Sequence, residues 1–275
     1  MLPKFGLGTF QLKDKSQLHA ILDTALRAGV RLIDTAQCYR NEHYISEILS
    51  ELLPKHNLTR EDVFIVSKID TKNQGYEKCM ESSRKSIELF SYIDVMLIHW
   101  PGVQGIKSQD PKIKQIRSET WCALESLHLE QSIRMIGVSN YNKHHLLELL
   151  DHCSVKPHVL QNEYHPRYQQ KDIVSLCKQH GIIFMGYSPL GQGDLLTDSI
   201  VTSISEETGL TPAQVLLKWG MQKGAIVIPR SVRTERVEEN VRSWVDGVEL
   251  SKGDLERLDG LEDGHKYCWD PEHVV

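Results

Sequence analysis

Four ionisable side chains occur in the first hundred residues at positions that suit proton chemistry. Asp34 ends one apolar stretch, and Tyr39 follows five residues later in a turn-like segment. Lys68 ends the next apolar stretch, and His99 ends the one after that. The carboxyl ends of successive parallel strands meet at one rim in a barrel, so we expect these four side chains to lie together.

Such a set suits the delivery of a proton to an oxygen atom. A free tyrosine has a pKa of about 10 and is a weak acid at neutral pH. An ammonium group beside it favours the phenolate, so we expect Lys68, held by Asp34, to lower the pKa of Tyr39. His99 is then suited to orient a carbonyl oxygen by a hydrogen bond. Singly, each residue has an ordinary structural explanation, and the shared position at strand ends favours a catalytic site.

A reduction also needs a hydride donor, and two segments are suited to hold a nucleotide cofactor. Residues 228–236 form a turn that opens a helix, where free backbone N–H groups favour an anion. Arg230 and Arg236 add guanidinium groups that bind phosphate through paired hydrogen bonds. The alternative is a solvated helix start whose arginines pair with nearby glutamates. The ring of Tyr187 is suited to stack on a flat heterocycle, although an ordinary rim aromatic is the simpler explanation.

Short apolar stretches alternate with amphipathic segments along the chain. Strands are predicted at 5–10, 31–34, 63–68, 93–99, 135–139, 159–161, 182–188 and 225–229. Helices are predicted at 16–28, 43–53, 76–89, 119–130, 143–150, 172–179, 212–221, 235–242 and 255–261. Gly29 is a C-terminal helix signal, and Thr211 with Pro212 is an N-terminal one.

Eight such units close most simply into a (β/α)8 barrel, the α/β fold that we expect here. We expect residues 1–275 to form a single domain, with a short tail at about 262–275 near the substrate mouth. An open, doubly wound sheet is the alternative. Its dinucleotide-binding version is disfavoured because Gly6 and Gly8 are followed by Thr9 and Phe10 without the third glycine of the motif.

Composition excludes several classes of protein. The chain has 275 residues, 40% of them hydrophobic and 25% charged, which is typical of a globular protein with a large core. The net charge of −5 argues against a nucleic-acid or anionic-membrane partner. No apolar run is long enough to span a bilayer, and no secretory leader is expected. The six cysteines form no C-x-x-C pair, so we expect neither disulfides nor a metal, and we predict a cytoplasmic monomer.

Together these segments resemble the aldo-keto reductase family, in the family's order and over nearly the whole chain. The matching segments are Gly6-Leu7-Gly8-Thr9, Asp34-Thr35-Ala36 with Tyr39 and Asn41-Glu42, the strand end at Lys68, Leu97-Ile98-His99-Trp100-Pro101, Gly137-Val138-Ser139-Asn140, Gln161-Asn162-Glu163-Tyr164, Tyr187-Ser188-Pro189-Leu190, Thr211-Pro212-Ala213-Gln214-Val215, and Ile228-Pro229-Arg230-Ser231 through Asn240. The resemblance implies a barrel that reduces aldehydes and ketones with a nicotinamide cofactor lying extended across its mouth.

The resemblance also implies roles for single residues. Tyr39 would be the proton donor, Lys68 and Asp34 its tuning pair, and His99 the group that orients the carbonyl. Residues matching the nicotinamide and pyrophosphate contacts are Thr9, Ser139, Asn140, Gln161, Tyr187, Ser188 and Leu190. Residues matching the adenosine end, including the 2′-phosphate grip that implies NADPH, are Arg230, Ser231, Val232, Arg236, Glu239 and Asn240.

Three departures from the family pattern stand out. Arg40 occupies the place after the tyrosine where the family usually has glycine. Arg230 replaces the usual lysine of the phosphate-binding turn, which keeps the charge and adds a planar fork. Phe10 replaces a tryptophan found in many members. The loop after Trp100 and the tail are short, and we expect an aromatic substrate wall made of Phe10, Trp100, Tyr267 and Trp269.

The leading prediction is therefore an NADPH-dependent reductase of small-molecule carbonyl compounds. One rival is a non-catalytic or dual-role binding or structural protein on the same scaffold. The presence of Asp34, Tyr39, Lys68 and His99 together disfavours an inactive version. A second rival is a barrel isomerase that needs no cofactor.

Overall fold

Eight short parallel strands form one sheet in which each strand pairs with its neighbours in the sequence. All 275 residues are described in this computed structural model. The strands follow the order β1 to β8 without a crossover. Their bounds are β1 (Leu7–Gly8), β2 (Leu32–Asp34), β3 (Phe64–Ile69), β4 (Ile93–Ile98), β5 (Ile133–Ser139), β6 (Val159–Glu163), β7 (Ile183–Tyr187) and β8 (Ile226–Val227).

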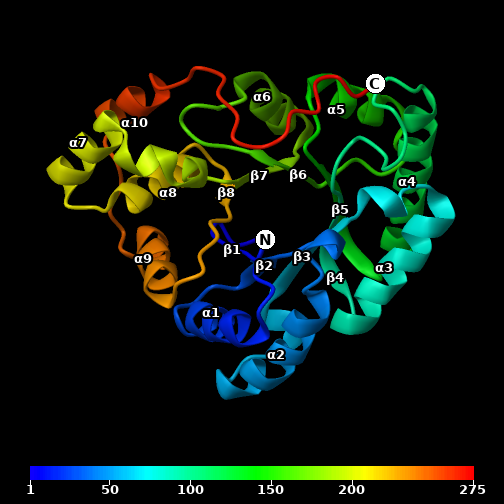
Figure 1. The fold of residues 1–275 in the computed structure, drawn as a ribbon, viewed down its shortest axis with the longest axis horizontal. Coiled ribbons are helices and arrows are strands. Elements are labelled where there is room, and N and C mark those ends of the chain that lie inside the picture. The colour runs from blue at the N-terminus through cyan, green and yellow to red at the C-terminus, as the bar shows by residue number, and fades with distance from the viewer.

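The first and last strands of the sheet meet and close it. Parallel bridges join Phe5 to Val227 and Gly8 to Arg230. The backbone N–H of Gly6 also donates to the carbonyl of Val227 at 2.9 Å. Figure 1 shows the strands around the centre with helices outside them. The predicted (β/α)8 barrel is confirmed, and the open doubly wound sheet is excluded.

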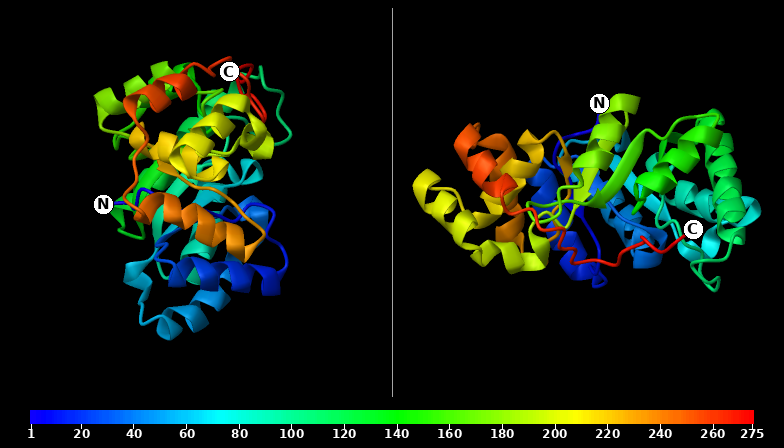
Figure 2. Two further views of the ribbon diagram at one scale, coloured as in Figure 1. Left: turned by 90° about the vertical axis from the view of Figure 1, so that its left-hand side faces the viewer. Right: turned by 90° about the horizontal axis from the view of Figure 1, so that it is seen from above.

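Ten α-helices connect the strands and surround the barrel (Figure 2). Their bounds are α1 (Lys15–Arg27), α2 (Glu42–Lys55), α3 (Tyr76–Phe90), α4 (Lys112–Leu129), α5 (Lys143–His152), α6 (Lys171–His180), α7 (Ser199–Thr208), α8 (Pro212–Gln222), α9 (Thr234–Val245) and α10 (Lys252–Asp259). Four 3-10 turns are η1 (Gln37–Tyr39), η2 (Arg60–Asp62), η3 (Thr71–Asn73) and η4 (Gly191–Thr197). None of the helices combines the length and apolar character that crossing a membrane requires.

Local signals in the sequence set several helix ends as predicted. Thr211 caps α8 through a reciprocal pair of hydrogen bonds with Gln214, and Pro212 is the first helical residue. Helix α1 ends at Arg27 with Ala28 as its C-cap, and Gly29 follows with a φ of +94°. A residue without Cβ adopts this left-handed conformation at little cost, so Gly29 ends the helix.

Two helical segments differ from the prediction. Helix α4 begins at Lys112, where a polar loop was expected up to about residue 117. Ile113 and Arg117 are both buried in this helix. The polar composition of the segment argued against a buried helix, but the charge of Arg117 is compensated by an ion pair with Glu148. Helix α7 was not predicted. Its N-cap is Asp198, whose side chain accepts from two backbone N–H groups.

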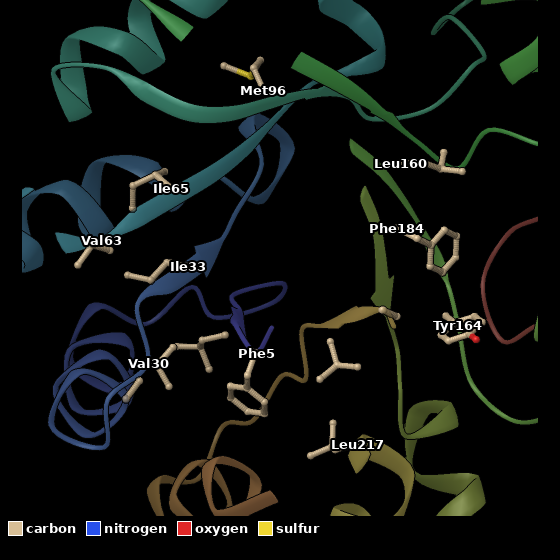
Figure 3. Packing of buried hydrophobic residues seen from close by; sticks show 14 of the residues in the cluster. Phe5, Val30, Ile33, Val63, Ile65, Met96, Leu160, Tyr164, Phe184 and Leu217 are labelled. Carbon is tan, nitrogen blue, oxygen red and sulfur yellow. The ribbon is translucent and has the colours of Figure 1, made fainter. Parts of the chain in front are cut away.

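Two hydrophobic clusters separate the inside of the barrel from the helical layer. The barrel interior holds nine buried residues: Leu2, Leu32, Val66, Val95, Leu97, Val159, Met185, Ile226 and Ile228. A larger cluster of 53 buried residues lies mainly between the strands and the helices (Figure 3). In β4, Val95 and Leu97 belong to the inner cluster while Met96 and Ile98 belong to the outer one. This alternation follows from the two-residue period of a strand.

The tail after α10 crosses from that helix to the α4 and α5 side of the barrel (Figure 1). The backbone N–H groups of Tyr267 and Cys268 donate to the buried carboxylate of Glu163 at 2.7 and 3.2 Å. At its end, the backbone N–H of Val275 donates to the carbonyl of Ser108, and Arg117 donates to Val275 at 2.6 Å. Hydrogen bonds therefore fix the tail to the barrel both near Glu163 and at its C-terminal end.

At Gly137 the backbones of β5 and β6 leave no room for a Cβ atom. A Cβ atom at this position would lie 2.2 Å from the carbonyl oxygen of Val159 and 2.8 Å from Cδ2 of Leu97. The first of these atoms belongs to the backbone of β6, so it cannot move without disturbing the sheet. Only glycine fits here.

We predict that Gly137→Ala lowers the free energy of unfolding by about 2 to 3 kcal/mol, because overpacking displaces backbone. The control is Gly253→Ala in α10, where a Cβ would meet its nearest atom at 3.7 Å, an ordinary contact. Denaturant unfolding followed by circular dichroism measures both. Equal midpoints for the two variants would contradict this account of the β5–β6 contact.

Candidate active site

The two-residue period of the strands turns three ionisable side chains toward the barrel mouth. Asp34 lies two residues beyond Leu32, Lys68 two beyond Val66, and His99 two beyond Leu97. Leu32, Val66 and Leu97 belong to the inner cluster. Side chains two residues apart in a strand point the same way, so the next residue on this face continues into the mouth. All three ionisable residues are buried.

Lys68 is the centre of the site. Its Nζ donates to Oδ1 of Asp34 at 2.7 Å and to the backbone carbonyl of Thr35 at 2.8 Å. The same Nζ lies 3.5 Å from the hydroxyl of Tyr39. An ammonium group has three donors, and these contacts use all three. The predicted grouping of carboxylate, ammonium and phenol is therefore present in space.

Tyr39 completes the group with His99. Tyr39 ends η1, and its ring lies 5.8 Å from the imidazole of His99 in an edge-on arrangement. On another side the ring of Phe10 lies 5.1 Å away. These contacts hold the phenol at the rim, between the ammonium of Lys68 and the imidazole.

The pKa of Tyr39 is raised well above its ordinary value, against the expectation from sequence. Burial of the phenol is the main cause, and the negative charge of Asp34 adds to it. Lys68 was expected to bring this pKa below its ordinary value, but burial and the charge of Asp34 shift the pKa in the opposite direction. That expectation is therefore wrong: Tyr39 holds its proton at neutral pH.

His99 is neutral at neutral pH. Burial lowers its pKa well below the ordinary value, and the charge of Lys68 acts in the same direction. The side-chain amide of Asn140 donates to the backbone carbonyl of His99 at 2.9 Å, which fixes the end of the strand. A neutral imidazole carries one N–H donor, so His99 is suited to donate one hydrogen bond to a bound oxygen.

Four predicted nicotinamide contacts form a connected network around these residues, in which the amide of Asn140 also donates to the hydroxyl of Ser139 at 3.2 Å. The amide of Gln161 donates to Oδ2 of Asp34 at 2.7 Å, a contact that the sequence did not reveal. Ser139 donates to the backbone carbonyl of Gln161 at 2.8 Å. The hydroxyl of Tyr187, at the end of β7, donates to Oδ1 of Asn140 at 2.5 Å. The ring of Tyr187 is half-buried at the rim.

The remaining residues predicted to contact the inner part of the cofactor occupy different settings. Thr9 is fully buried, and its hydroxyl donates to the backbone carbonyl of Asp34 at 2.8 Å. It therefore supports the strand end that carries Asp34, and a direct cofactor contact stays a prediction. Ser188 has a φ of +49° and lies beside Cys268. Leu190 is half-buried and packs against the outer core.

The start of α9 has free donors and unpaired guanidinium groups. Its N-cap, Arg233, makes no side-chain capping hydrogen bond. Arg230 donates to the side-chain oxygen of Gln11 at 3.0 Å, and neither Arg230 nor Arg236 forms an ion pair. The one glutamate of this helix in an ion pair is Glu238, which binds Arg27. These arginines are therefore not paired with local glutamates in the structure, and their role in binding phosphate stays a prediction.

The other residues predicted at the adenosine end lie in the same region. The hydroxyl of Ser231 accepts the backbone N–H of Arg233 at 3.0 Å. Val232 is exposed. Glu239 accepts a hydrogen bond from the hydroxyl of Thr211 at 2.6 Å, and Asn240 is buried. The pairing of Glu239 with the start of α8 was not expected.

Three of the four predicted wall aromatics gather at the rim. Phe10 contacts Tyr39, and Trp100 stacks beside His99 with ring centres 6.1 Å apart. Trp269, in the tail, packs edge-on against Trp100 at 5.0 Å. Tyr267 makes none of these contacts. Its hydroxyl donates to Asp194 at 2.6 Å and its ring packs on His165, so Tyr267 fastens the tail to the rim instead.

Two side chains beside Tyr39 have settings that the sequence did not indicate. Arg40 has a φ of +58° and a ψ of +32°, the left-handed region that costs a residue with a Cβ about 1 to 2 kcal/mol. This conformation explains why glycine suits the position. The Arg40 side chain is exposed and forms no ion pair. On the other side of Tyr39, the Cys38 sulfur lies 3.3 Å from Nδ1 of His99.

Two hollows lie away from this group. One of about 320 Å³ is lined by residues of α2 and α3, with Gln37 at its edge. The other, of about 350 Å³, lies along α4 and α5. Neither is lined by Asp34, Tyr39, Lys68 or His99, so neither belongs to the site described above.

The fold and the rim group agree with comparisons to known proteins. The family model described as "Aldo/keto reductase family" matches residues 4–263. The chain is 37% identical to a glyoxal reductase of Bacillus subtilis over 276 residues, covering 100% of this chain and 94% of the relative. It is 35% identical to the 9,11-endoperoxide prostaglandin H2 reductase of Trypanosoma cruzi over 277 residues, covering 99% and 92%.

Solved structures show the same architecture. An aldo-keto reductase from a deep-sea metagenome library of the Medee basin superposes with a TM-score of 0.90 at 30% identity, covering 100% of this chain and 97% of that one. The aldose reductase of Schistosoma japonicum superposes with a TM-score of 0.86 at 32% identity, covering 95% and 90%. Sequence, fold and relatives agree, and the chain belongs to the aldo-keto reductase family.

Proposed function

We propose that this protein reduces small aldehydes and ketones to alcohols with NADPH, using Tyr39 as the proton donor. The observation that carries the proposal is the position of the Lys68 ammonium, 2.7 Å from Asp34 and 3.5 Å from the Tyr39 hydroxyl. Family membership and the reductases among the relatives support carbonyl reduction. The cofactor preference and the residue roles are our inference from the geometry.

The proton transfer from Tyr39 depends on the interaction that its phenolate makes after the proton has left. An alkoxide forming from a carbonyl is a stronger base than a phenolate, so a phenol with a raised pKa still donates to it. Once Tyr39 has donated, its phenolate lies beside the ammonium of Lys68, which stabilises the new negative charge. The neutral imidazole of His99 orients the carbonyl oxygen by donating a hydrogen bond.

The rim residues fit a phosphorylated nicotinamide nucleotide. NADPH, when bound, supplies the hydride. The ring of Tyr187 offers a flat face at the end of β7. The start of α9 offers backbone N–H groups, with Arg230 and Arg236 free of carboxylate partners. Two unpaired guanidinium groups at a helix start suit a 2′-phosphate, which is why we infer NADPH rather than NADH.

Aromatic side chains form the substrate side of the site. Phe10, Trp100 and Trp269 surround the rim beside Tyr39 and His99, so flat or compact carbonyl compounds fit it best. One relative is named a glyoxal reductase, and we include dicarbonyl compounds among the first substrates to test. We further propose that the protein acts as a monomer in the cytoplasm, with the tail beside the substrate mouth.

The two rival functions make different predictions for cofactor binding. A cofactor-free isomerase predicts no change in tryptophan fluorescence when NADPH is added. A binding protein on this scaffold predicts quenching without turnover. Our proposal predicts both quenching by NADPH and its oxidation in the presence of a carbonyl compound.

We predict that Tyr39→Phe lowers the rate of carbonyl reduction by at least roughly a hundredfold, because the general acid is lost. NADPH binding, followed by fluorescence quenching, should stay near wild type. The control is Tyr76→Phe at the exposed first residue of α3, which should keep full activity. Undiminished turnover by Tyr39→Phe would remove Tyr39 as the proton donor.

We predict that Arg236→Ala weakens NADPH binding roughly tenfold to a hundredfold, the value of a charge-assisted contact to phosphate, and leaves NADH binding almost unchanged. Arg242→Ala, in the same helix, is the matched control for loss of one charge. Titration of both nucleotides gives the two ratios. Equal weakening of NADPH and NADH by Arg236→Ala would refute the 2′-phosphate contact.

We predict that kcat/KM for reduction stays level as the pH rises from about 7 to about 10. The active form of Tyr39 is protonated, and a raised pKa keeps it protonated until the pH passes that raised value. His99, with its pKa lowered, stays neutral across the same range. A fall in kcat/KM between about pH 7 and 9 that Tyr39→Phe abolishes would show that the phenol is acidified instead.

A further inference from the structure

The thiol of Cys38 contacts the imidazole of His99. Cys38 is the middle residue of η1, directly before Tyr39. Its Sγ lies 3.3 Å from Nδ1 of His99, within hydrogen-bonding distance for sulfur. Nδ1 makes no other hydrogen bond in the protein, so this thiol is its sole partner.

Both members of this contact are uncharged at neutral pH. Burial of the thiol is the first cause that raises the pKa of Cys38 to about 11, with the charge of Asp70 adding to it. The residue is open to solvent as a whole, but its sulfur faces the imidazole. The pKa of His99 is lowered by burial. The contact is therefore between a protonated thiol and a neutral imidazole.

A neutral imidazole has one nitrogen that donates and one that accepts, and its neighbours decide which is which. If Nδ1 carried the proton, its acceptor would be a thiol sulfur, which accepts hydrogen bonds weakly. If Nδ1 is unprotonated, the thiol S–H donates to a basic nitrogen lone pair. The second arrangement is the better hydrogen bond, and it leaves the proton on Nε2.

Nε2 is the nitrogen that matters for a substrate. It makes no hydrogen bond within the protein, although His99 is only 8% exposed. Nε2 is not among the buried polar atoms that lack a partner, so it reaches the barrel mouth and is available to a ligand. The ring of Tyr39, 5.8 Å away, lies edge-on to the same imidazole, so a ligand oxygen that reaches Tyr39 also lies near His99.

We propose that Cys38 is a positioning residue for carbonyl reduction: its thiol donates to Nδ1 of His99 and holds the tautomer that carries the proton on Nε2. The proposal rests on the proposed function, because His99 must donate to the carbonyl oxygen for the tautomer to affect the rate. Cys38 itself touches neither substrate nor cofactor in this role. It acts through the orientation and protonation of His99.

The direct test is the tautomer of His99 by long-range 1H–15N NMR of the uniformly labelled protein, without substrate. His99→Gln identifies the His99 signals by their loss. We expect wild type to show the proton on Nε2. Cys38→Ala should shift His99 toward a mixture of the two tautomers, and Cys38→Ser, whose hydroxyl also donates, should retain the wild-type tautomer. An unchanged tautomer in Cys38→Ala overturns the proposal.

Kinetics then separates this role from simple packing. We expect Cys38→Ala to lower kcat roughly threefold to tenfold, the effect of one weak hydrogen bond, with KM little changed. Cys38→Ser should recover most of that loss. The control is Cys122→Ala, which removes an exposed thiol of α4. A tautomer shift in a protein that reduces no carbonyl compound would uphold the contact and refute the reductase function. A kcat loss that Cys38→Ser does not recover would refute the positioning role.

Discussion

The ion pair between Lys68 and Asp34 is the interaction on which the rest of the site depends. Both side chains are buried, at 1% and 4% exposure, and removing one partner would leave a charge in the barrel interior at a cost of about 3 to 5 kcal/mol. Three further contacts stabilise the pair: Lys68 also donates to Thr35, Gln161 donates to Asp34, and Thr9 holds the Asp34 backbone. A buried ion pair of this kind adds little net stability, so its chemical role explains its presence better than the fold does.

The barrel fixes the positions of the strand ends, and the ionisable side chains at these ends form the site. In β2, β3 and β4 the buried hydrophobic residues that face the barrel interior are aliphatic, and the next position on the same face is ionisable at the mouth, as at Lys68 after Val66. Burial that stabilises the barrel also keeps Tyr39 protonated and His99 neutral. The same desolvation strengthens the interaction of Lys68 with a phenolate formed on proton transfer. Burial therefore both stabilises the barrel and sets the protonation states of the side chains at this rim.

What could be predicted from the sequence depended on local patterns. The ends of the apolar stretches placed Asp34, Lys68 and His99 at one rim, and the turn after the first stretch placed Tyr39 with them. The contacts of Gln161 with Asp34 and of Cys38 with His99 could not be predicted, because each joins side chains of distant elements whose rotamers follow from packing. The direction of the Tyr39 pKa shift was missed for a related reason. The sign of the pKa shift depends on how deeply the phenol of Tyr39 is buried and on how Lys68 is paired. The spacing of residues in the sequence shows neither.

The segments predicted least well lie where tertiary contacts override local composition. The start of α4 was predicted as a loop because the segment is rich in charged residues. The ion pair of Arg117 with Glu148, which allows Arg117 to be buried, cannot be read from the sequence. The most direct test of the central claim is a crystal structure of the protein with NADP+ bound. The account predicts that C4 of the nicotinamide and the Tyr39 hydroxyl face one space, so that a carbonyl group reaches both at about 3 to 3.5 Å. A nicotinamide ring that lies away from Tyr39 and Lys68 would contradict it.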